Sequence, residues 1–549
     1  MLRSRKQQQQ QAVSSSNGSS SLDAWPPPSS RDDDEDPRGR SKSIIPKSLI
    51  GTLVVASVLF LILLFNGSFS NESNNSINPG SSSINAASKQ GGGIVIGDNN
   101  IQNKQLRNAE IQNNNKIVNH NININQASNN NNTTSPTTGA TLHIIFSTDC
   151  GSYQHWQSYL FFHRAYTIHQ PGYITRIASG CTDKELEDEK AWHEEHISSV
   201  MSDRFRIHFT PHFSGVKDEA TGKVKGDYKY FNKPFGLKHF LENHELLGMI
   251  DSNNNDEIQM KHPNDIIILC DPDFALLRPI TDDFSNPKDT LVGPRRKAHF
   301  NQMSSHIVTH GQPYAQTYGL GTQWRQFDLD EIAGVDSPAK EVSQKDGGMF
   351  YPVGPPYIGT ASDMHKIAVA WSEFAPRVHK EYPHLLAEMF AYCIAAAHLK
   401  LPHTLIDSLM ISNPGAGGEG WRHIAQIPPS ETCSNFDADN HNDRPLPNVL
   451  HYCQRYMFNG YFWGKRRVPH KIFTCDHPLF ADPPSDLASG PDERTDKDRM
   501  NVFVICAMTR IVNDAMLFFK ESSCGSEGGG NRERKELVPF VNLRNQKGR

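Results

Sequence analysis

Two acidic residues, Asp271 and Asp273, follow a short apolar run and have the chemistry to hold a divalent cation. The run, residues 266–269, leads through Cys270 into Asp271, and Pro272 cannot continue a central strand, so a buried strand should end at Asp271. Neighbouring carboxylates repel each other unless a cation lies between them, and their hard oxygen atoms suit Mn²⁺ or Mg²⁺. An ordinary polar turn is the alternative, because Asp-x-Asp is common.

A strand–helix–strand unit near the start of the folded region should place further polar side chains beside these acids. The pattern predicts a strand over 142–146, a helix over 153–169 and a second strand over 173–178. Such a unit implies a parallel sheet, whose ligands bind at the carboxyl ends of the strands. We therefore expect a nucleotide near Ser147, Thr148, Asp149 and Ser179. No dinucleotide-binding or P-loop glycine motif occurs, so those two classes have no support.

Three later segments add candidate polar groups. Asn232 and Lys233 precede a predicted helix, whose N-terminus could hold a phosphate or a sugar hydroxyl. Glu388 is the one acid of an almost wholly apolar helix, where a carboxylate is costly unless it is paired or functional. His451 could complete the metal shell, although a core histidine is the alternative. The basic run 465–467 could neutralise a leaving diphosphate or simply face water.

Several other segments have patterns that predict an element of structure. The predicted helices cover 183–202, 364–375 (ended by Pro376), 385–399 and 500–520; residues 403–410 predict a strand and 318–324 a surface loop. All nine cysteines lie beyond residue 149 without zinc or redox spacing, so some should pair in an oxidising compartment and at least one should stay free. Cys270, inside the apolar run, is expected to be a small buried hydrophobe.

The remainder of the chain predicts a membrane-anchored protein. Residues 49–65 are almost wholly apolar, lysine and arginine cluster on the amino side, and the net charge of −5 gives no reason to expect nucleic acid as a partner. A cleaved signal peptide is the alternative to a type II anchor. The predicted regions are a disordered cytosolic tail (1–48), a transmembrane helix (49–66), a disordered, asparagine-rich lumenal stem with glycosylation sequons (67–140), a catalytic domain (141–480), a helical extension (481–520) and a disordered tail (521–549).

Five motifs occur in an order that resembles a known family. They are HIIFSTDC with QPGYITRIASGC, YFNKPFGLKHFLE, IIILCDPDFALLRPI, AEMFAYCIAAAHLKLPHTL and VLHYCQRY. Over roughly residues 141–480 this set resembles the peptidyl serine α-galactosyltransferases and hydroxyproline O-arabinosyltransferases, which are plant and algal Golgi enzymes. The resemblance implies an α/β fold with a GT-A-like (Rossmann-like) domain and a mostly parallel sheet, on a single-pass type II anchor in the Golgi membrane with its catalytic part in the lumen.

The resemblance also implies an activity and a set of site residues. It implies transfer of arabinofuranose or galactose from a UDP-sugar to hydroxyproline or serine of secretory-pathway proteins, with Mn²⁺ (or Mg²⁺). The residues carried over are Asp271, Asp273 and His451 for the metal, Glu388 and Asp273 for catalysis, and Arg176, Asn232 and Lys233, beside Ser147, Thr148 and Asp149, for the nucleotide sugar. The acid motif with Pro272 between its two acids is not assigned to one branch of the family, so the donor sugar stays open.

Two other functions compete with this interpretation. A haloacid-dehalogenase-like phosphatase also ends a strand with Asp-x-Asp, but it requires Thr or Val where this chain has Ala275. A catalytically inactive sugar-binding or scaffold protein would keep the fold, and the intact acid pair together with His451 argues against it.

Overall fold

The computed structural model describes residues 133–535 except 218–220, 252–257, 434–444, 490–494 and 526–528. The predicted cytosolic tail, transmembrane helix, most of the stem and most of the C-terminal tail lie outside the described residues. Within the described part, one helix is long and apolar enough to cross a membrane: α13, Asp496–Ser523. Because 78% of its most apolar window is buried inside the protein, α13 is the core helix of a folded domain.

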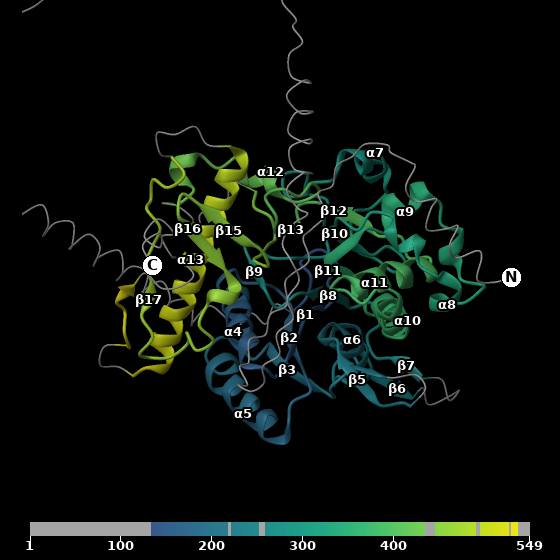
Figure 1. Ribbon diagram of the computed structural model, residues 1–549, viewed down its shortest axis with the longest axis horizontal. Helices are drawn as coiled ribbons and strands as arrows, with labels where there is room; N and C mark the ends of the chain where they lie inside the picture. The colour runs from purple at the N-terminus through teal and green to yellow at the C-terminus, as the bar shows by residue number, and fades with distance from the viewer. Residues whose placement is uncertain are drawn as a thin grey trace, which may run out of the picture. The chain divides into compact units, whose positions relative to one another are not determined.

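A seven-stranded sheet forms the centre of the molecule, in the order β12-β10-β11-β8-β1-β2-β3 (Figure 1). The strands are β1 Leu142–Asp149, β2 Tyr173–Ser179, β3 Phe205–Thr210, β8 Ile266–Cys270, β10 Tyr314–Thr317, β11 Val353–Thr360 and β12 Thr404–Ile406. Only β11 runs antiparallel to its neighbours in this sheet; the other pairs are parallel. The predicted α/β class and mostly parallel sheet are therefore confirmed, and the arrangement fits a Rossmann-like fold.

Both faces of the sheet are buried, which explains the uninterrupted apolar run in β8. Ile266, Ile268 and Cys270 face one core cluster, which α4 (Ser152–Thr167) and α13 complete. Ile267 and Leu269 face the other cluster, with α6 (Asn232–Asn243), α10 (Ala361–Glu381) and α11 (Ala387–His398). Figure 1 shows these two groups of helices on opposite sides of the strands.

A smaller three-stranded sheet brings distant parts of the chain to the end of β8. It consists of β13 (Met410–Ile411), β14 (Val449–His451) and β9 (Phe274–Leu276). His451 pairs in register with Phe274, the residue directly after Asp273. A hairpin of β15 (Arg455–Phe458) and β16 (Tyr461–Gly464) follows, and a 3-10 turn, Lys465–Arg467, leaves it toward the same place.

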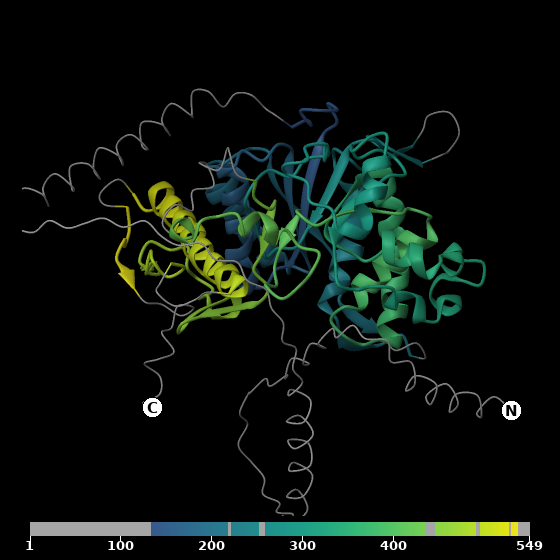
Figure 2. The same ribbon diagram turned by 90° about the horizontal axis from the view of Figure 1, so that it is seen from above.

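The C-terminal helix is part of the main core. α13 contacts α4, β15 and β16 and shares the first cluster with strand β1. In Figure 2 α13, in yellow, lies beside the blue N-terminal part of the domain, which includes α4. Two disulfides, Cys433–Cys506 and Cys475–Cys524, fix it to its surroundings. The strands β17 (Leu479–Phe480) and β18 (Arg534–Lys535) pair beside it.

Several sequence predictions need correction. The helix predicted to stop before Pro376 continues to Glu381, because Phe374, Ala375 and Val378 are all buried and their packing outweighs the missing hydrogen bond. The helix expected over 183–202 is α5 (Asp183–His193) followed by a π-helix (Glu194–Ser198). The strand expected over 403–410 divides into β12 and β13, which belong to different sheets.

Two segments that looked irregular are built into the core. β11 contains two glycines and two prolines, which hid it in the sequence, yet it is a fully buried strand between β8 and β10. The segment 318–324, expected as a surface loop, buries Leu320 and Trp324 completely or nearly so.

The other elements complete the cover of the domain. They are β4 Gly215–Lys217, β5 Val224–Asp227, β6 Met249–Asp251, β7 Ile258–Met260, α7 Pro294–Gln302, α8 Leu329–Ala333, α9 Gln344–Phe350 and α12 Trp421–Ile424, with 3-10 turns at Lys229–Phe231, Gln323–Gln326, Pro338–Glu341 and Pro429–Glu431.

Candidate metal and nucleotide-sugar site

Asp271, Asp273 and His451 converge at the carboxyl end of β8. Each offers a ligand atom, and these atoms lie within 4.8 Å of one another. The His451 Nε2 atom is 3.2 Å from Asp273 Oδ1 and 3.9 Å from Asp271 Oδ2. The turn at Pro272 ends β8 and turns both acids toward β14, whose last residue is His451. The structure thus brings together the three residues that the sequence named for the metal.

Each of the two carboxylates pairs with a lysine. Lys233, in the first turn of α6, lies with its Nζ atom 2.7 Å from Asp271 Oδ1. Lys465, in the turn after β16, pairs with Asp273 Oδ2. Although burial acts to lower them, the pKa values of both ammonium groups are raised by the carboxylates that they face. Both lysines therefore stay charged.

Glu388 joins this group through Lys233. Its side chain is 4% exposed, and Lys233 Nζ lies 3.1 Å from its Oε1 atom. Its Oε2 atom is buried and has no hydrogen-bond partner among the described residues. Burial raises the pKa of Glu388, against the opposing charge of Lys233. The backbone of Glu388 is fixed, because its carbonyl accepts from Trp371 Nε1 (2.6 Å) and its amide donates to the Tyr228 hydroxyl (3.3 Å).

The acid and imidazole nearest Lys465 form a charged pair. Burial acts to raise the pKa of Asp273, but the charges of Lys465 and His451 hold it well below its usual value. Burial acts to lower the pKa of His451, but Cys453 and Asp273 raise it well above the usual value. The His451 Nδ1 atom is buried without a hydrogen-bond partner among the described residues.

The donor set suits a divalent cation of the Mn²⁺ or Mg²⁺ class. Two carboxylates and one imidazole are hard or borderline ligands, and their ligand atoms already lie close together. A cation would also neutralise the carboxylates of Asp271 and Asp273, which now pair with the two lysines. The group Asp271, Asp273 and His451 could therefore bind a metal, with Glu388 beside it through Lys233.

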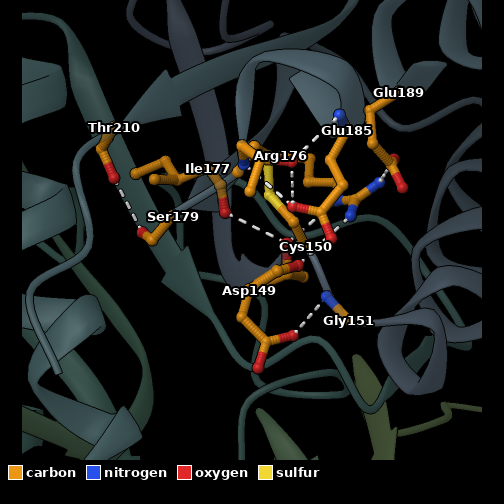
Figure 3. Close-up of a disulfide and its surroundings, with 12 residues drawn as sticks. Asp149, Cys150, Gly151, Arg176, Ile177, Ser179, Glu185, Glu189 and Thr210 are labelled. Atoms are coloured by element: carbon orange, nitrogen blue, oxygen red, sulfur yellow. Dashed lines mark hydrogen bonds and ion pairs between the residues drawn. A yellow bond between two sulfur atoms is a disulfide. The ribbon is translucent and has the colours of Figure 1, made fainter. Parts of the chain in front are cut away.

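The expected nucleotide contacts at the ends of β1 and β2 are bonded mainly to one another. Arg176 is 1% exposed; its Nη1 atom lies 2.6 Å from Glu189 Oε2, and its Nε atom donates to Thr148 Oγ1 at 2.9 Å. Asp149 accepts from Gly151 N at 2.9 Å and pairs with Lys229 at 2.9 Å. A disulfide, Cys150–Cys181, joins the two strand ends directly beside these bonds (Figure 3).

The two small hydroxyl residues of this edge are also enclosed. Thr210 donates to Ser179 Oγ (dashed line in Figure 3), at a distance of 2.8 Å, and Ser147 is 9% exposed. Asn232 is 4% exposed, and its Oδ1 atom accepts from the Phe213 amide at 3.0 Å. Among the predicted nucleotide-sugar residues, Lys233 is the one that forms ion pairs with Asp271 and Glu388 in the described part of the chain. For all of these residues, Lys233 included, nucleotide contact remains a prediction.

Aromatic residues border the acids, and most were missed from the sequence. Tyr318 follows β10, and its ring packs on Gly354 of β11 so closely that a Cβ atom there would lie 2.5 Å from the ring. Burial raises the pKa of Tyr318, and Cys453 and Asp271 add to the rise. Burial also raises the pKa values of Tyr153 and Tyr230, which the charges of Lys465 and Asp273 shift in opposite directions. The glycine and aromatic residues of 318–324 were a usable signal for Tyr318; Tyr153 and Tyr230 gave none.

The cysteines follow the expectation from the sequence. All nine lie among the described residues; six form three disulfides, and Cys270, Cys393 and Cys453 are free. Cys270 is buried in β8, as predicted.

Comparison with known proteins gives a distant match. No protein-family model matches the chain. The chain is 22% identical over 413 residues to the peptidyl serine alpha-galactosyltransferase of Arabidopsis thaliana, and the match covers 72% of this chain. The chain spans 40% of the length of that relative. This similarity supports a relationship to glycosyltransferases in general, without singling out a sugar or an acceptor.

Proposed function

We propose that this protein is a metal-dependent glycosyltransferase with a GT-A-like domain, which moves a sugar from a UDP-sugar to serine or hydroxyproline of secretory-pathway proteins. One observation carries the proposal: Asp271, Asp273 and His451 meet at the carboxyl end of a central strand, and Lys233 ties Glu388 to them. Ligands of open α/β sheets bind at that edge. The distant relative and the ordered motifs of the sequence support the same reaction class.

Each residue of the site would have its own role in such a reaction. Asp271, Asp273 and His451 would hold Mn²⁺ or Mg²⁺, which when bound stabilises the charge that develops on a leaving diphosphate. Lys233 and Lys465 add positive charge beside the same place. Glu388 has one oxygen fixed by Lys233 and one without a hydrogen-bond partner among the described residues. This second oxygen is suited to orient an acceptor hydroxyl or to stabilise positive charge at the anomeric carbon.

The proposal extends to the cellular setting. The apolar run at 49–66 would anchor the protein as a single-pass type II protein in the Golgi membrane, with the catalytic domain in the lumen. Galactose and arabinofuranose are the proposed sugars. Three disulfides suit the oxidising lumen of the secretory pathway.

Donor turnover tests the proposal. Full-length protein with Mn²⁺ is offered UDP-galactose, UDP-arabinofuranose, UDP-glucose and UDP-xylose, each with serine- and hydroxyproline-rich peptides, and both UDP release and peptide mass are measured. We expect transfer from one donor, lost in Asp273→Asn and retained in Asp330→Asn, an exposed aspartate of α8. A folded protein that binds a glycopeptide but releases UDP from no donor would contradict the proposal and favour a sugar-binding protein.

A further inference from the structure

Every carboxylate of the candidate metal site already has an ammonium partner within the chain. Lys465 lies on Asp273, and Lys233 lies between Asp271 and Glu388. These are the acids whose oxygens would bind a divalent cation. A cation and an ammonium group that face the same carboxylate repel each other, so the two compete for the site.

The two lysines differ in how firmly they are held. Lys233 is 11% exposed and bridges two acids, Asp271 and Glu388, at 2.7 and 3.1 Å. Lys465 is 24% exposed, and its one carboxylate partner among the described residues is Asp273, which it reaches from a short 3-10 turn at the border of the site. A lysine is a compact charge on a flexible stem, so its ammonium group can swing without movement of the backbone. Lys465 is therefore the ammonium that a cation displaces more easily.

A displaced Lys465 needs a new negative partner close by. A metal alone would leave Lys465 and Lys233 beside one divalent cation, which is an excess of positive charge. A diphosphate that binds with the metal supplies negative oxygens beside it, and an ammonium group binds such oxygens as a point charge. Lys465 thus exchanges the Asp273 carboxylate for a diphosphate oxygen as its negative partner, and the net charge of the site stays close to zero.

We propose that Lys465 is an exchangeable counter-ion: it occupies Asp273 in the empty site and moves to the diphosphate of the nucleotide when metal and nucleotide bind together. This inference rests on the proposed function, since it assumes a metal and a nucleoside diphosphate as ligands. If Lys465 exchanges in this way, metal and nucleotide bind cooperatively. The diphosphate relieves the repulsion between the metal and Lys465, and the metal frees Lys465 to bind the diphosphate.

Direct binding measurements test this without any turnover. Mn²⁺ binding to full-length protein is followed by electron paramagnetic resonance, with and without UDP, for the native chain, Lys465→Met and Lys471→Met. Lys471 is an exposed lysine in the same segment and controls for the loss of one positive charge. In Lys465→Met the uncompensated Asp273 should bind Mn²⁺ alone about tenfold more tightly, while the increase in affinity that UDP causes should shrink about tenfold. Lys471→Met should behave as the native chain does.

The outcomes separate the inference from the proposed function. A native chain that binds Mn²⁺ equally well with and without UDP overturns the inference and leaves the function standing. A Lys465→Met chain that binds Mn²⁺ alone more weakly than the native chain also overturns it, since Lys465 would then support the metal. No Mn²⁺ binding to a folded native chain under either condition overturns the proposed function and the inference together.

Discussion

The polar groups at the end of β8 and those at the ends of β1 and β2 lie on neighbouring strands of one sheet edge, but they are bonded differently. At β1 and β2, Arg176 pairs with Glu189, Thr210 with Ser179, and the Cys150–Cys181 disulfide joins the strand ends. At β8, Glu388 and His451 each keep a buried atom without a hydrogen-bond partner among the described residues.

Position at the edge of the sheet is therefore not enough to identify a ligand site. Polar groups that satisfy one another stabilise the edge at which they lie. Buried charges that retain unused atoms keep the capacity to bind something else, although burial without a partner is costly. We therefore expect mutations at β8 to affect chemistry and mutations at β1 and β2 to affect stability.

The largest expected effect is at Glu388. Glu388→Gln keeps the shape of the side chain but removes its charge, so transfer should fall about a thousandfold. The free energy of unfolding should change little, because burial already disfavours the charged carboxylate. Kinetics of sugar transfer and urea denaturation measure the two quantities on the same protein. Transfer at the native rate would place the chemistry away from Glu388.

Arg176 provides the opposite case. Arg176→Met breaks a buried ion pair and leaves Glu189 with the more distant His155, 3.7 Å away, so the free energy of unfolding should fall by about 3 kcal/mol. The UDP affinity of the remaining folded protein should be unchanged if the role is purely structural. A tenfold or larger loss of UDP affinity at native stability would instead support the nucleotide contact that the sequence predicted for Arg176.

Protonation of His193, which lies beside β3, should lower the free energy of unfolding in acid. This histidine of α5 is 5% exposed, its Nε2 atom bonds to the Phe205 carbonyl at 3.1 Å, and burial lowers its pKa to about 4. The unfolded chain, with a histidine pKa near 6.5, binds the proton first, so stability is lost as the pH falls from 6.5 toward 4. This group should contribute a loss of about 2 kcal/mol between pH 7 and pH 5.

The variant His193→Gln keeps a donor for the carbonyl and removes the titration. Denaturation at several pH values should show a shallower acid dependence for this variant than for the native chain. Equal acid dependence in the two proteins would assign the effect to other buried histidines.

The smallest expected effect is at Gly354. A Cβ atom there would lie 2.5 Å from the Tyr318 ring, so the ring must change its position near the acids. Gly354→Ala should lower kcat/KM for transfer about tenfold in a folded protein. Gly226→Ala is the control, since its Cβ atom would meet Val216 at an ordinary 3.8 Å. An unchanged rate for Gly354→Ala would exclude Tyr318 from the site.

The fold could be predicted where local pattern and burial agree. The apolar run of β8 and the strand–helix–strand unit of β1, α4 and β2 were found close to their observed bounds. β11 could not be found, because its glycines and prolines argue locally against a strand and only its place between β8 and β10 makes it one. Pro376 does not end α10 for a similar reason, because the buried residues on both sides of it keep the helix packed in the core.

The buried strand and the two acids at its end follow from the sequence alone, because both depend on residues close together in the chain. The groups that surround those acids depend on the tertiary structure. Lys465 lies 192 residues from Asp273, and Lys233 lies 155 residues from Glu388. No local pattern selects such partners among 55 lysines and arginines. They are chosen by the packing of α6, α11 and the small β9–β14 sheet, which fixes where each side chain ends.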